Sequence, residues 1–146
     1  PEPEEFAASG LLHDIGKIVM AQFLKDEFNE VMRLLKDENI LFLEAERRAL
    51  GVAHTDIARW LLEKWRLPPE TVVPVISHHD LKEDDPHAMR VAVVHLADVL
   101  VRADGIGSGD ELVPPLNPAA MRLLKLNTGH LQGIMDEMRV ELFELD

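Results

Sequence analysis

His13 and Asp14 are adjacent near the end of an apolar run, and Lys17 follows three residues after Asp14. An imidazole nitrogen and a carboxylate oxygen are both ligands for divalent transition metals, and such an ion can promote hydrolysis. A lysine at this distance could hold an anionic oxygen of a substrate. We therefore interpret this stretch as part of a metal site, with Asp14 and Lys17 as the candidate catalytic residues.

Further potential metal ligands lie at intervals along the chain, and these are His54, His78, His79 and Asp98. Asp98 lies on an apolar face with Val91 and Val94, where an unpaired carboxylate would be costly to bury. The alternative is a carboxylate paired with His95, Lys17 or a backbone donor. The histidines, in turn, could be buried residues that are merely hydrogen-bonded, and one of the adjacent pair could support a ligand from behind.

The absence of cysteine limits what kind of metal site the chain can form. Thiolate sites and disulfides are excluded, so any ligands must be His, Asp, Glu or water. A nitrogen-rich ligand set favours iron, manganese, nickel or zinc over calcium. We therefore expect a divalent transition metal as the cofactor, if the site is occupied.

The net charge of −12 bears on possible partners. A polyanion would be repelled, which argues against direct binding of nucleic acid, whereas a small phosphorylated ligand is compatible if a metal offsets the charge locally. No stretch resembles a membrane span, and no basic segment of a signal peptide precedes the first apolar residues. We expect a cytoplasmic protein.

The elements that must position these side chains are helical nearly throughout, because apolar residues recur at three- and four-residue spacing. We expect an all-α fold with helices over 4–12, 15–25, 26–36, 44–50, 54–65, 69–79, 88–102, 118–125 and from 128 onward. With 146 residues, 47% of them hydrophobic, the chain can form one domain with a sizeable core.

Helix faces indicate which side chains point inward. We expect Ile18 and Phe23 to face the core from the second helix, and His54 and Trp65 to share the inward face of their helix. The helix over 88–102 is apolar almost all round, as a central buried helix would be. Helix ends and inward faces can converge at one point in an all-α domain, which would bring the potential ligands together.

The potential ligands follow one another along the chain as His13-Asp14, His54, His78-His79 and Asp98. This order resembles the pattern of the HD-domain superfamily, in which a His, a His-Asp pair and an Asp recur. The stretch from Gly10 through Lys17, Gly-Leu-Leu-His-Asp-Ile-Gly-Lys, matches its central signature. The chain is most similar to the HDOD domain, the HD-related output domain of bacterial signalling proteins. The HD-GYP branch instead continues from the double His into Gly-Tyr-Pro, whereas Asp80 follows His79 here and the chain has no Tyr.

The resemblance implies an HD-type multi-helix bundle, with residues 1–146 as a single HDOD-like domain. It also implies a C-terminal portion of a longer protein, because the family has a first His and further helices upstream of His13-Asp14. The metal ligands implied are His13, Asp14, His54, His78, His79 and Asp98.

Two functions remain open at this point. The first is a regulatory output domain of bacterial signal transduction, which acts through helix packing and contacts with other signalling domains or proteins, with a retained or vestigial metal site. The second is a metal-dependent phosphohydrolase or phosphodiesterase with one or two ions. Self-association into a homo-oligomer is compatible with both.

Overall fold

The computed structural model describes residues 4–106 and 112–143, and within these ranges the chain forms nine helices and no strand. This confirms the predicted all-α fold. In chain order, the helices are α1 (Glu4–Leu12), α2 (Ile15–Phe23), α3 (Lys25–Glu38), α4 (Phe42–Leu50), α5 (His54–Lys64), α6 (Pro69–Ser77), α7 (Ala88–Ala103), α8 (Pro118–Leu124) and α9 (Thr128–Phe143).

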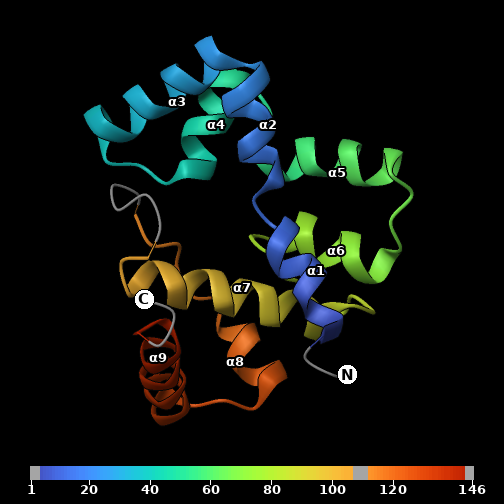
Figure 1. Cartoon of the computed structure of the whole chain (residues 1–146), viewed down its shortest axis with the longest axis vertical. Helices are drawn as coiled ribbons and strands as arrows, with labels where there is room; N and C mark the ends of the chain where they lie inside the picture. Colours follow the sequence, from blue (N-terminus) through green and yellow to red (C-terminus); the bar gives the residue numbers. More distant parts are fainter. Residues whose placement is uncertain (1–3, 107–111, 144–146) are drawn as a thin grey trace.

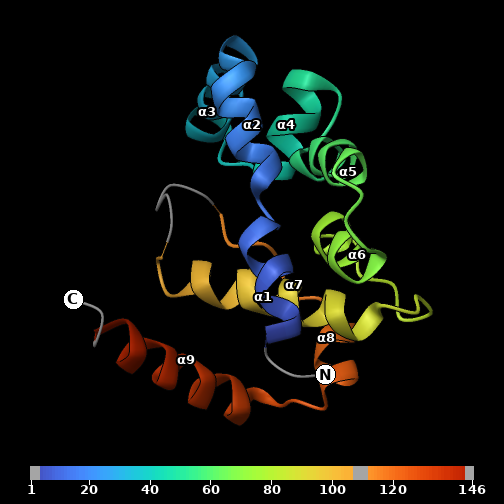
Figure 2. The same ribbon diagram turned by 45° about the vertical axis from the view of Figure 1, so that its right-hand side comes forward.

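The helices are arranged in three groups along the long axis of the molecule (Figures 1 and 2). Helices α2, α3 and α4 lie at one end, α1, α6 and α7 lie in the middle, and α8 and α9 lie at the other end. Helix α5 packs against both α2 and α6, and α7 packs against α1, α6 and α8. The centre of the molecule is therefore where helices from the first two groups approach one another.

Local sequence explains where several helices begin and end. Pro69 at the first position of α6 has the φ angle of a helix and no N–H that needs a partner. Gly51 ends α4 in the left-handed conformation, with φ 76°, and its N–H donates to the carbonyl of Arg47. Helix α2 ends at Phe23, two residues earlier than predicted, because Leu24 leaves the helical conformation and α3 begins at Lys25.

Helix α7 is the buried central helix that its sequence predicts. Its buried side chains include Val91, Ala92, Val94 and Leu96 as well as Asp98. Apolar contacts with α8 and with the neighbouring loop cover the first half of α7. Asp98 is thus held in a fixed position within a packed interior.

Three predictions of inward-facing side chains are wrong. Ile18 is 61% exposed, Phe23 is 72% exposed and Trp65 is 53% exposed. Helix α2 carries apolar residues on every side, so periodicity could not show that Met20 faces the core while Ile18 does not. Trp65 is the C-cap residue of α5, one position beyond the last residue of the helix, and the periodicity of the helix therefore did not predict its burial correctly. No helix in the described ranges is long and apolar enough to cross a lipid bilayer.

Candidate metal centre

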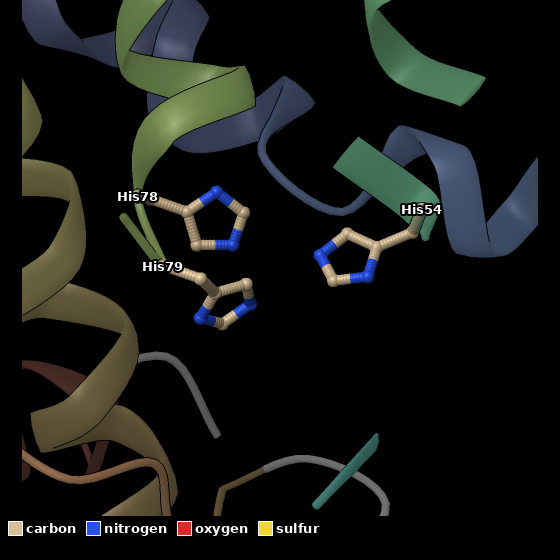
Figure 3. Close-up of side chains that lie close together, drawn as sticks. All are labelled: His54, His78 and His79. Carbon is tan, nitrogen blue, oxygen red and sulfur yellow. The ribbon is translucent and has the colours of Figure 1, made fainter. Parts of the chain in front are cut away.

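The six predicted ligands come from four separate parts of the fold and meet in its interior. They are His13 and Asp14 between α1 and α2, His54 at the start of α5, His78 and His79 just after α6, and Asp98 within α7. Figure 3 shows the rings of His54, His78 and His79 near one another, with His54 at the start of α5 and the other two just beyond the end of α6.

One cluster consists of His13, Asp14 and Asp98, which offer ligand atoms within 4.8 Å of one another. The Nε2 atom of His13 lies 3.5 Å from Oδ2 of Asp14 and 3.6 Å from Oδ1 of Asp98. Its Nδ1 atom donates to the carbonyl of Gly10 at 2.7 Å, because a carbonyl oxygen can only accept. The backbone of α1 therefore turns the Nε2 side of His13 toward both carboxylates.

A second cluster consists of His54, His78 and His79, whose ligand atoms also lie within 4.8 Å of one another. Nδ1 of His78 donates to the carbonyl of Val75 at 2.6 Å, which leaves the lone pair on Nε2. Nε2 of His54 lies 3.4 Å from Oδ1 of Asp14. Asp14 therefore connects the two clusters.

Several buried polar atoms in this region have no hydrogen-bond partner among the described residues. They are Oδ1 of Asp14, Oε1 of Glu46, Nε2 of His54, Nε2 of His78 and Oδ2 of Asp98. Leaving such groups unsatisfied costs about 1–3 kcal/mol each, so their accumulation in this region needs an explanation. Apart from the Glu46 atom, they form a set of two nitrogens and two oxygens, which fits a divalent transition-metal ion.

The electrostatics of His78 and His79 favour metal binding. Burial, together with the neighbouring imidazoles, lowers the pKa of His78 to about 3 and that of His79 to about 2. Both rings are therefore neutral at physiological pH, as metal ligation requires.

Burial by itself would raise the pKa values of both central carboxyl groups, but nearby partners outweigh it. Lys17 and two histidines hold the pKa of Asp14 below its usual value, and the nearby His13 and Arg102 hold that of Asp98 well below. Both carboxyl groups are therefore ionised at neutral pH and can act as anionic ligands.

Each of these two carboxylates has one oxygen bound to a side-chain cation. Lys17 Nζ donates to Oδ2 of Asp14 at 2.8 Å, and a terminal nitrogen of Arg102 donates to the same oxygen at 3.1 Å. Arg102 Nε donates to Oδ1 of Asp98 at 2.6 Å. The two cations thus orient the carboxylates so that the opposite oxygens, Oδ1 of Asp14 and Oδ2 of Asp98, remain for an ion.

His95 and Lys17 were the side chains expected as alternative partners of Asp98. The structure shows a different partner. Arg102 holds Asp98, and their spacing of four residues on one helix is a signal that the sequence offered. His95 instead donates from Nδ1 to the carbonyl of His78 at 2.7 Å and accepts from the backbone N–H of Asn117 at 2.9 Å. His95 therefore supports the backbone next to the site.

Glu46 on α4 is a fully buried carboxylate that was not among the predicted site residues. Its Oε2 atom lies 2.7 Å from Nδ1 of His54. The available signal was its place beside Ala45 and Phe42 on the apolar side of a short helix, where an acidic residue is unusual.

A pocket with a volume of about 140 Å³ adjoins the centre. Its polar lining is formed by Lys17, His79, His95 and Arg102. The remaining lining residues are apolar and are Leu41, Phe42, Leu43, Leu112, Pro114 and Pro115. A small ligand with an anionic group and an apolar part fits a pocket of this composition.

An all-α fold in which His and Asp side chains from separate helices gather in one region is the arrangement expected of the HD-type class. The sequence model of the HDOD domain matches residues 1–81, more than half of the chain, and the chain therefore belongs to the HDOD family. Asp98 lies beyond the matched stretch.

The fold is also similar to a crystal structure described as an HDOD domain protein with unknown function from Geobacter sulfurreducens. The TM-score is 0.74 and the sequence identity is 27%, over 91% of this chain and 49% of that one. This chain thus spans about half the length of that protein. A comparison with curated proteins found no match.

Proposed function

We propose that this HDOD domain is a regulatory module of bacterial signal transduction whose interior binds a divalent transition-metal ion. The observation that carries the proposal is the set of unpartnered donor atoms on Asp14, His54, His78 and Asp98. Iron, manganese, nickel and zinc are the ions suited to such ligands.

The position of these donors explains how the metal would act on the fold. They belong to the α1–α2 junction, α5, the end of α6, and α7, and they form two neighbouring groups, so an ion bound in either group would join segments distant in sequence. An ion that binds only the native packing stabilises that packing in proportion to its occupancy. The arrangement of these helices, and hence their contacts with other signalling domains or proteins, would then depend on the metal.

A regulatory site must also be compatible with the metal-free state. Lys17 and Arg102 balance the charges of Asp14 and Asp98 one for one, which removes most of the repulsion between the two carboxylates. Because these two cations belong to the protein itself, the carboxylates are neutralised without metal. The metal-free and the metal-bound protein can therefore both be folded. This favours reversible regulation over a metal required for folding.

A second function, metal-dependent hydrolysis of a phosphate ester, is favoured by the pocket beside the centre. When bound, the ion would supply Lewis-acid stabilisation of a phosphoryl group. Lys17 and Arg102 would hold phosphoryl oxygens, and Asp14 would orient both cations through its Oδ2 atom.

One experiment separates the two functions. The full chain is purified without chelator, its metal content is measured by mass spectrometry, and phosphodiester and nucleotide substrates are assayed with added Mn²⁺ or Fe²⁺. We expect about one ion per chain, loss of that ion in Asp98→Asn, and no turnover. Asp136→Asn, on an exposed part of α9, is the matched control and should retain the ion.

Turnover that disappears in Asp98→Asn but persists in Asp136→Asn would establish the hydrolase and overturn the purely regulatory function. Protein that binds no Mn²⁺, Fe²⁺, Ni²⁺ or Zn²⁺ would overturn both.

A further inference from the structure

Glu46 and His54 form a fully buried pair between α4 and α5. Both side chains are 0% exposed, and 2.7 Å separates Oε2 of Glu46 from Nδ1 of His54. A buried carboxylate is costly unless it is paired, and the second oxygen of Glu46 has no hydrogen-bond partner among the described residues. Packing alone does not explain an acidic residue at this position.

The pair determines which nitrogen of His54 is available. A carboxylate oxygen accepts a hydrogen bond, so the proton lies on Nδ1 and the lone pair lies on Nε2. Nε2 is the atom that lies 3.4 Å from Oδ1 of Asp14 and lacks a hydrogen-bond partner among the described residues. Glu46 therefore directs the lone pair of His54 toward the other unpartnered donors.

We infer that Glu46 is a positioning residue, which holds His54 in the tautomer and orientation that a metal ion requires. This inference rests on the proposed function, because it concerns the same metal centre. A carboxylate behind a ligating histidine fixes the ring and increases its basicity, and the loss of such a partner typically weakens metal binding.

The surroundings of Glu46 extend this role to a second part of the fold. Helix α4 packs mainly against α3, and its Phe42 and Ala45 belong to the apolar cluster that includes Met20 and Val31. The ring of Phe42 lies beside that of His54, with 6.3 Å between the centroids. The Glu46–His54 hydrogen bond is thus a polar link between the metal centre and the α3–α4 pair, and metal binding should stabilise α4 through it.

The test compares two variants at this position with a matched control on the same helix. Glu46→Gln keeps a hydrogen-bond acceptor but loses the charge, whereas Glu46→Leu loses both. Glu44→Gln changes a residue of α4 whose side chain is 56% exposed. Binding of Mn²⁺ and Zn²⁺ to the chelator-treated full chain is measured by calorimetry, and the ring nitrogens of His54 are observed by NMR without metal.

We expect Glu46→Gln to weaken metal binding about tenfold and Glu46→Leu about 100-fold, with Glu44→Gln unchanged. The NMR spectrum should show the Nδ1–H tautomer in the wild type and in Glu46→Gln, and a mixture of tautomers in Glu46→Leu. Metal should slow hydrogen exchange of the α4 amides in the wild type, and less so in Glu46→Leu.

The outcomes separate this inference from the function on which it rests. Wild-type protein that binds no metal would overturn both. Wild-type binding with the same affinity in both Glu46 variants would overturn the inference alone. If Glu46→Leu does not fold, as judged by circular dichroism, Glu46→Gln decides, and an affinity within twofold of the wild type overturns the inference.

Discussion

At the scale of single residues, the position of His54 depends on a glycine in another helix. A Cβ atom on Gly16 would lie 2.0 Å from the backbone oxygen of His54, so α2 and α5 can approach this closely only where the side chain is absent. The same contact places Asp14 close to His54, since Asp14 immediately precedes α2. Gly16 thus helps to define the distance between two of the candidate ligands.

We predict that Gly16→Ala destabilises the protein by about 1–3 kcal/mol, because the added methyl group overlaps backbone that cannot move freely. Gly10→Ala is the matched control within α1, where a Cβ meets nothing within 4 Å. It should be neutral or stabilising by up to about 1 kcal/mol. Urea unfolding measures both, and equal stability of the two variants would contradict the role of Gly16.

At the scale of elements, the end of α6 is held in place by α7. His95 in α7 connects the carbonyl of His78 to the backbone N–H of Asn117, which caps α8. Three segments are thereby tied together behind His78. The position of His78 in the site is consequently a property of how α6, α7 and α8 pack.

Replacing His95 by leucine should leave the carbonyl of His78 and the N–H of Asn117 without their buried partner. We predict a loss of about 1–3 kcal/mol in the free energy of unfolding, measured with denaturant. His87→Leu is the control, since His87 is only half-buried at the start of the same helix. A His95→Leu variant as stable as His87→Leu would show that this link contributes nothing.

At the scale of the whole molecule, the buried histidines affect the dependence of stability on pH. The pKa of His78 falls to about 3 and that of His79 to about 2, against 6.5 for an ordinary histidine. Below 6.5 the unfolded chain takes up protons that the folded protein excludes, so stability decreases as the pH falls. The raised pKa of His13 acts above 6.5 instead, where stability is lost as the pH rises and the folded protein gives up that proton.

We therefore predict that the metal-free protein loses stability as the pH is lowered from about 6.5 towards 4, with a slope that approaches two protons, one each for His78 and His79. His78→Gln should flatten this slope, whereas His130→Gln, on an exposed part of α9, should leave it unchanged. Chemical unfolding at a series of pH values, with chelator present, measures the slope. A stability that is constant or rises over this interval would contradict the prediction.

The sequence by itself determined the helices and the types of residue at the centre. Helix periodicity and local signals such as Pro69 and Gly51 act between near neighbours in the chain, so they can be read without knowing the fold. The predicted ligands were proposed from their chemistry and their family spacing, and the structure brings them together. Their role as metal ligands remains a prediction.

Only the tertiary structure decided which faces are buried and which charges pair. Phe23 was predicted to be inward and is exposed, whereas Glu46, unremarked in the sequence, is fully buried. Arg102 reaches Asp14 across 88 positions of the chain. Burial and pairing depend on contacts between distant segments, and short-range patterns carry no information about which segments will meet.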